Sequence, residues 1–99
     1  MQAEQHEDYA VITLPEVIDL INAPDFKNVL RTLYDQNCNN IKINCSQLEM
    51  IDSAGIGSLV FFQKKLKDRG GGLRLVNVTN DYIKHLFNML DLARVINIE

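Results

Sequence analysis

The sequence of 99 residues predicts an α/β fold, with a mixed, mostly parallel sheet of about four to five strands and crossover helices. Two observations carry this prediction. Short runs of β-branched and other apolar residues alternate with longer segments whose apolar residues recur at helical spacing. Asparagine, proline and glycine separate these segments, and no repeat or linker-like stretch interrupts them. The length suits one core, so we expect residues 1–99 to form a single small domain, in which residues 1–8 are a polar N-terminal segment.

The first third of the chain predicts a strand, a second short apolar piece and a helix. Residues 9–14 form the strand, which Pro15 ends, and residues 17–21 follow as the apolar piece. We expect residues 9–21 to supply an antiparallel or mixed edge of the sheet. Asn22 is the expected cap of a helix over residues 23–36. The apolar residues of that helix recur at helical spacing; they are Phe26, Val29, Leu30 and Leu33.

The middle of the chain predicts a strand, a connection and a second helix. Residues 41–45 alternate as a strand should, and residues 46–51 read as a connection. The helix begins at Ser53, and the three glycines at 70–72 stop it. Phe61 and Phe62 are adjacent, so both cannot face the sheet. The expected inward stripe consists of Ile56, Leu59, Val60, Gln63 and Leu66.

The last third predicts a strand, a helix and a short closing strand. Residues 73–78 form the strand, and Thr79 or Asn80 caps the helix. Residues 95–98 supply the last strand. The expected inward face of the helix consists of Ile83, Leu86, Phe87 and Leu90.

Composition excludes several classes of function. The net charge of −3 gives no large basic footprint for nucleic acid. No apolar run is long enough to insert across a bilayer, and residues 1–8 lack the apolar core of a secretory signal. Cys38 and Cys45 are too few for a disulfide scaffold or a zinc site. We expect two free thiols in a reducing cytoplasm.

The segment 50–57, Met-Ile-Asp-Ser-Ala-Gly-Ile-Gly, joins a strand-like run to a helix-like run. It places the hydroxyl of Ser53 at a helix start, where unpaired N–H groups and the helix dipole favour an anion. Three roles are open for Ser53: a helix cap, a nucleophile or a phosphorylated residue. Residue type alone favours a cap, formed by Asp52 or Ser53.

The sequence disfavours an enzyme. A hydroxyl nucleophile needs a base, and the two histidines are His6, in the polar N-terminus, and His85, expected to face solvent on a helix. Ser53 does not lie in a G-x-S-x-G elbow, and the chain has no G-x-x-x-x-G-K-[ST] loop. Its carboxylates are scattered, so neither a metal nor a cofactor is expected.

The residues around Ser53 point instead to a binding surface. Met50, Ile51, Ala54 and Ile56 surround the polar Asp52–Ser53 pair. A cap does not require such an apolar rim. An apolar rim around an exposed serine is typical of a docking surface that added charge can switch.

Residues 43–57, Ile-Asn-Cys-Ser-Gln-Leu-Glu-Met-Ile-Asp-Ser-Ala-Gly-Ile-Gly, resemble the signature of STAS domains, the bacterial anti-sigma factor antagonists. The family pattern is a hydrophobic-Asp-hydrophobic-Ser run, followed by Asp-Ser-(Ser/Ala/Thr)-Gly-(Leu/Ile)-Gly. Segments 19–24, 70–73 and 86–92 also follow in the order of the family. The resemblance extends over residues 9–98 and implies the same small α/β fold.

Four positions depart from the family pattern. Asn44 stands where an aspartate is usual, and Glu16 with Val17 replaces a Gly-Glu pair. Ala54 replaces a second serine found in some members, which leaves Ser53 as the phosphoacceptor that the resemblance implies.

The resemblance implies a partner-switching regulator and not an enzyme. Ser53 matches the serine phosphorylated by a GHKL-type kinase that often doubles as an anti-sigma factor, and a PP2C-type phosphatase removes the phosphate. The unphosphorylated domain binds the kinase and frees the sigma factor. The expected partner-binding residues are Asp19, Asn22, Met50, Ile51, Asp52, Ala54, Gly55, Ile56 and Gly57.

Two alternatives stay open at this point. The chain could be a constitutive accessory subunit, like the stand-alone STAS proteins of lipid-transport ABC systems, and never be phosphorylated. It could also act on a small phosphorylated ligand, which only the anion site at the helix start supports. Asp19 fits a turn residue as well as a group near Ser53.

Overall fold

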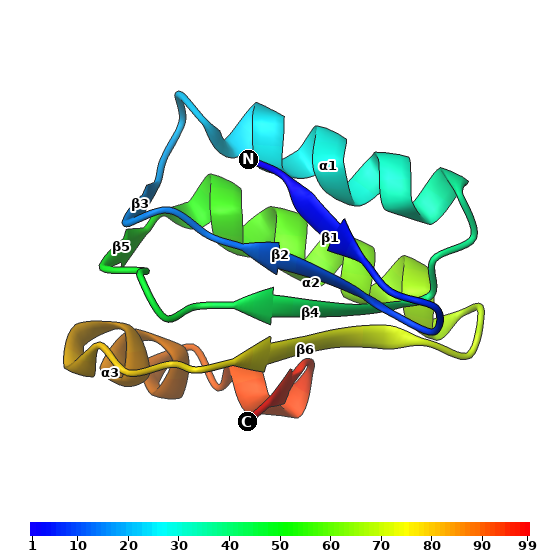
Figure 1. Ribbon diagram of the computed structural model, residues 1–99. Coiled ribbons are helices and arrows are strands. Elements are labelled where there is room, and N and C mark those ends of the chain that lie inside the picture. Colours follow the sequence, from blue (N-terminus) through cyan, green and yellow to red (C-terminus); the bar gives the residue numbers. More distant parts are fainter.

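The computed structural model describes residues 1–99 and shows a five-stranded sheet, a separate two-stranded ladder and three α-helices (Figure 1). The strands are β1 (Ala3–Gln5), β2 (Ala10–Thr13), β3 (Val17–Ile18), β4 (Asn40–Asn44), β5 (Met50–Ile51), β6 (Gly72–Val76) and β7 (Asn97–Ile98). The helices are α1 (Ala23–Asp35), α2 (Ser53–Lys67), α3 (Asp81–Met89) and the single 3-10 turn η1 (Leu92–Arg94).

The main sheet has the strand order β1-β2-β4-β6-β7, and only β1 is antiparallel to its neighbour. Between each pair of parallel neighbours the chain passes through a helix, and each step moves the same way along the sheet. Right-handed crossovers therefore place α1, α2 and α3 on one face. Figure 1 shows α1 and α2 side by side along the strands, and the two helices are in contact. This confirms the predicted α/β class and the mostly parallel sheet.

The core lies between the sheet and this helical layer. Ile12, Ile43 and Leu75 sit in one cross-strand row and are fully buried. Phe26 from α1 and Phe62 from α2 are buried in the same core. The preceding residue of each strand points to the open face, as the period of two requires; that row is Val11, Lys42 and Arg74.

The two-stranded ladder lies outside the main sheet and is the part that positions the site. Val17 pairs with Met50 and Ile18 with Ile51, both in parallel register. The ladder continues for one bond, because the N–H of Asp52 donates to the carbonyl oxygen of Ile18 at 3.0 Å. The loop that follows β3 and the first turn of α2 are therefore held at the same end of the molecule.

Two expectations about strands are wrong. Residues 1–8 contain β1, whose antiparallel pairing with β2 forms the mixed edge that residues 9–21 were expected to supply. Glu4 and Gln5 of this edge strand are exposed, so β1 has little hydrophobic signal in the sequence. The segment 46–51 was expected to be a plain connection and contains β5, which is too short for a period to be recognised.

The inward face of α2 also differs from the expected stripe. Val60 is 37% exposed, whereas Ser58 and Phe62 are buried together with Leu59 and Leu66. Phe62 takes the inward position, so Phe61 is half exposed, as their adjacency predicts. In α3, Ile83 and Phe87 are buried, whereas Leu90 at the C-cap is exposed. Asn80 caps α3 by accepting the N–H of Ile83 at 3.0 Å.

The two glycines of α2 differ in the space around them, and this predicts opposite effects of alanine. A Cβ on Gly55 would lie 2.6 Å from Ile51 Cγ1 and 2.7 Å from Ile18 Cγ2, whereas a Cβ on Gly57 meets nothing within 4 Å. We expect Gly55→Ala to lower the free energy of unfolding by about 1–3 kcal/mol through overpacking. Gly57→Ala should raise it by up to about 1 kcal/mol, since alanine favours the helix. Urea unfolding of both variants measures the difference, and equal shifts would contradict the close contact at Gly55.

Cys45 predicts a loss of stability at alkaline pH. Burial raises the pKa of the Cys45 thiol from 9.0 to about 12. The folded protein therefore keeps the thiol protonated where the unfolded chain ionises it, so the free energy of unfolding should fall as pH rises from 9 towards 12. Below pH 9 this contribution is constant. Unfolding curves over this range should show a shallower decline for Cys45→Ala; parallel pH profiles would refute the assignment.

Candidate functional site

Ser53 is the first residue of α2, and its side chain is exposed. Its hydroxyl forms no hydrogen bond with the rest of the chain, so it is free to react or to be modified. Asp52 occupies the N-cap position with an extended backbone at φ −97° and ψ −175°. Asp52 Oδ1 accepts the N–H of Ala54 at 3.0 Å and of Gly55 at 3.3 Å. Of the two possible caps, Asp52 is the one that caps α2.

The Asp52 cap determines which hydrogen-bond donors and charges an anion on Ser53 would meet. Two N–H groups of the first turn already donate to Asp52 Oδ1, and the N–H of Ile56 donates to the Asp52 carbonyl oxygen at 3.0 Å. The N–H of Ser53 has no acceptor within the chain. An anion on Ser53 Oγ would therefore meet the positive end of the helix dipole, but also the adjacent Asp52 carboxylate.

The structure brings no general base to Ser53. Neither histidine is hydrogen-bonded to it: His6 stacks on Tyr9 and pairs with Glu4 at 3.2 Å, and His85 is exposed on α3. No group of three histidine, cysteine or carboxylate side chains is placed to hold a metal ion. No helix has both the length and the apolar character needed to cross a membrane.

Asp19 and Asn22 form a reciprocal turn between β3 and α1. Asp19 Oδ1 accepts the N–H of Ile21 at 2.9 Å, and Asn22 Oδ1 accepts the N–H of Asp19 at 2.9 Å. The Asn22 amide also donates to the carbonyl oxygen of Val17 at 2.7 Å. Asn22 lies at the N-cap position of α1, but its side chain makes no capping bond to the helix, contrary to expectation. Both side chains instead fix the shape of the loop.

This turn displays two apolar side chains that sequence reasoning missed. Leu20 is 76% exposed and Ile21 is 89% exposed. Met50, from the partner strand of β3, is 52% exposed. An apolar pair flanked by the turn formers Asp19 and Asn22 is a detectable signal, because a turn leaves no room to bury both side chains.

Some of the expected partner-binding residues are accessible at the surface, and others are buried beneath it. Met50 and Gly57 are exposed, and Asp52, Ala54 and Ile56 are half-buried at the start of α2. Asp19 and Asn22 are half-buried at the same end of the molecule. Ile51 and Gly55 were expected to face a partner, but both are buried where α2 meets the β3–β5 ladder. They hold the surface in place from below.

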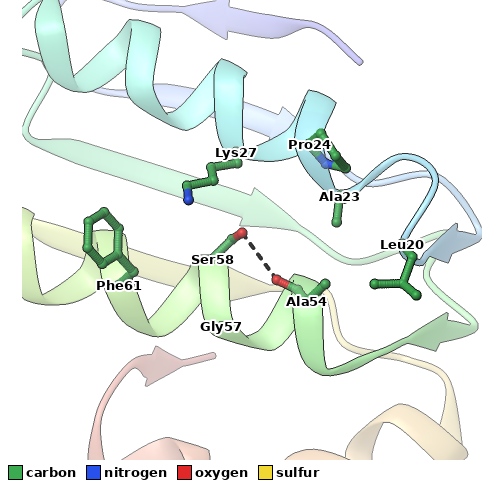
Figure 2. Close-up of a pocket in the computed structure, with 8 residues that line it drawn as sticks. All are labelled: Leu20, Ala23, Pro24, Lys27, Ala54, Gly57, Ser58 and Phe61. Carbon is green, nitrogen blue, oxygen red and sulfur yellow. Dashed lines mark hydrogen bonds between the residues drawn. The ribbon is translucent and has the colours of Figure 1, made fainter.

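A shallow apolar groove runs between the first turns of α1 and α2, with a volume of about 580 Å³. Leu20 and Pro24 form one wall, and Ala54, Gly57 and Phe61 form the other (Figure 2). The groove begins one residue beyond Ser53. The exposed Ser53 hydroxyl, the exposed apolar side chains of Leu20, Ile21 and Met50, and the apolar groove therefore lie at one end of the molecule.

The chain resembles known proteins in both sequence and fold. The chain is 29% identical over 98 residues to the anti-sigma-B factor antagonist of Bacillus subtilis (strain 168), covering 99% of this chain and 88% of that protein. The fold matches the crystal structure of an anti-sigma factor antagonist from Mycobacterium paratuberculosis with a TM-score of 0.86, at 18% identity, over 98% of this chain and 81% of that one.

The Bacillus cell fate determinant SpoIIAA in its phosphorylated form matches with a TM-score of 0.77, at 21% identity, over 99% of this chain and 89% of that one. These two structures share the fold. The family model described as STAS domain matches residues 1–99. The chain therefore belongs to the STAS domain family.

Proposed function

We propose that this chain is a partner-switching regulator of the anti-sigma factor antagonist type, with Ser53 as its phosphoacceptor. The observation that carries the proposal is the exposed Ser53 hydroxyl, free of intramolecular hydrogen bonds, at the same end of the molecule as the exposed side chains of Leu20, Ile21 and Met50. The similarity to the anti-sigma-B factor antagonist of Bacillus subtilis supports an anti-sigma factor as the partner. The protein acts by binding and not by catalysis, in the cytoplasm.

The proposed partners are a GHKL-type serine kinase that is also the anti-sigma factor, and a PP2C-type phosphatase. The kinase binds the unphosphorylated surface formed by Met50, the start of α2 and the Asp19–Asn22 turn. Phosphorylation of Ser53 releases it. The buried residues Ile51 and Gly55 contribute by holding this surface rigid.

Local electrostatics supply the switch. A phosphate adds about −1.5 to −2 charges and three acceptor oxygens at Ser53. The two N–H groups held by Asp52 are not free to neutralise it, so the added charge stands beside the Asp52 carboxylate at the surface. A partner that covers the apolar rim must desolvate this charge. Because α2 and its cap stay as they are, binding changes without refolding.

The first test is the site of phosphorylation. Incubation with a cognate GHKL-type kinase and ATP should add one phosphate to the protein and none to Ser53→Ala, as measured by intact-mass spectrometry. Ser46→Ala, which removes an exposed hydroxyl elsewhere, and Ser58→Ala, which removes a buried hydroxyl bonded to the Ala54 carbonyl oxygen at 3.2 Å, should be phosphorylated normally. Uptake of phosphate by Ser53→Ala would exclude Ser53 as the acceptor.

The second test is the effect of charge on binding. Ser53→Glu should weaken binding to the kinase by roughly 5- to 150-fold, the range of coupling energies of about 1–3 kcal/mol. Ser53→Ala should bind like the unmodified protein, and so should Ser53→Gln, which matches the size of glutamate without its charge. Calorimetric titration measures all three affinities. Equal weakening by Glu and Gln would show that bulk and not charge controls binding.

A further inference from the structure

A line of alternating cations and aromatic rings runs along the seam between α1 and α2. Lys27 Nζ lies 5.7 Å from the centre of the Phe61 ring, and Lys65 Nζ lies 5.3 Å from the same ring. Lys65 also lies 4.6 Å from the Tyr34 ring, which Arg69 covers at 3.3 Å. The line leads from the groove beside Ser53 towards the C-terminal end of α2.

The two lysines of this line have no anionic partner, although the chain as a whole carries a net charge of −3. The ion pairs in the structure use the Met1 amino group, Arg74 and Arg94 as cations, and His6 contacts Glu4. Arg69 is anchored, because it donates to Asn37 Oδ1 at 2.8 Å and to the Tyr34 carbonyl oxygen at 2.6 Å. Lys27 and Lys65 are held only over aromatic rings, which orient an ammonium group without neutralising it.

The groove and the lysines together define the chemistry of an occupant. The groove walls are apolar, and Figure 2 shows Lys27 reaching from α1 towards α2 beside Phe61. A segment lying along the seam would place apolar side chains against Leu20, Ala54 and Phe61. Its flanking positions would then lie within reach of the two ammonium groups. That pattern is an amphipathic helix with acidic residues beside its apolar face.

The same geometry disfavours two other polyanions. Nucleobases bind by stacking on open aromatic faces, but Arg69 covers the Tyr34 ring at 3.3 Å, and Lys27 and Lys65 lie over the Phe61 ring at 5.7 and 5.3 Å. A flat membrane surface would meet the protruding side chains of Leu20, Ile21 and Met50 but could not enter the groove between the helices, where Lys27 lies. Charge complementarity with an acidic helix fits both the groove and the cations.

We propose that the α1–α2 groove receives an acidic amphipathic helix of the protein partner, paired with Lys27 and Lys65. This inference rests on the proposed function, because it describes the partner that the Ser53 surface binds. It also adds a reason why phosphorylation would release that partner. A phosphate at the mouth of the groove would repel an acidic segment directly.

The test uses a defined probe: an amphipathic peptide of about five helical turns, with leucines on one face and glutamates beside them. Amide NMR spectra of the protein should shift at Lys27, Ala54, Gly57, Phe61 and Lys65 when this peptide is added. The same peptide with glutamine in place of glutamate should bind about tenfold more weakly, which corresponds to one well-placed charge contact.

Charge reversal on the protein provides the matched control. Lys27→Glu and Lys65→Glu should each weaken the acidic peptide about tenfold and leave the glutamine peptide unchanged. Lys84→Glu makes the same charge change at an exposed position of α3 and should have no such effect. The proposal is overturned if the groove shows no shifts, if both peptides bind equally, or if a single-stranded oligonucleotide or phosphatidylserine vesicles shift the same amides more strongly.

These outcomes are separable from those of the proposed function. If Ser53 accepts phosphate and its charge controls kinase binding, but Lys27→Glu leaves acidic-peptide binding intact, the groove proposal fails alone. If Ser53→Ala is still phosphorylated while the acidic peptide binds as expected, the assignment of Ser53 fails alone.

Discussion

The contact of Gly55 with Ile18 and Ile51 is the constraint on which the functional end of this molecule depends. Two strands of two residues each cannot form a stable sheet of their own. Here they are fixed because the first turn of α2 rests directly on them, closer than any side chain at position 55 would allow. That contact sets where α2 begins. It therefore sets the position of Ser53 and of Ala54 and Gly57, which line the groove.

The surface also depends on the different roles of two adjacent residues at the start of α2, Asp52 and Ser53. Asp52 satisfies the backbone N–H groups that a helix leaves unpaired, so Ser53 need not. A serine that served as the cap would use its hydroxyl in that bond, and modification would cost helix stability. With Asp52 as cap, the hydroxyl of Ser53 is available and α2 does not depend on it. The arrangement separates the integrity of the fold from the chemical state of the surface, which is the physical requirement for a local switch.

The sequence predicted the elements with a clear period and a clear end. Phe26, Leu30 and Leu33 identified α1, and the alternation of Ile41 and Ile43 identified β4. It could not predict β1 and β5, because an exposed edge strand has no apolar period and two residues have none at all. The α/β class and the parallel order were nevertheless predictable from the alternation of element types.

The sequence identified the segment that forms the site, but not which of its side chains are exposed at the surface. The run 50–57 identified the start of α2, yet composition could not distinguish the exposed Met50 from the buried Ile51, since both are apolar and adjacent. Only the register of the β3–β5 ladder decides which of them faces inward. The exposure of Leu20 and Ile21 likewise depends on the reciprocal bonds of Asp19 and Asn22, which are formed in three dimensions.

The charges around the groove are unevenly distributed, and this bears on how a switch at Ser53 can act. Asp19 and Asp52 shortly precede the groove residues Leu20 and Ala54 in the chain, whereas Lys27 lines the groove and Lys65 lies over the ring of Phe61 in its wall. An acidic segment bound there already experiences attraction along the groove and repulsion at its mouth. A phosphate at Ser53 enlarges the repulsive part and leaves the lysines as they are. Because the unmodified balance is a difference between opposing contributions, a modest added charge changes occupancy strongly, without any movement of the backbone.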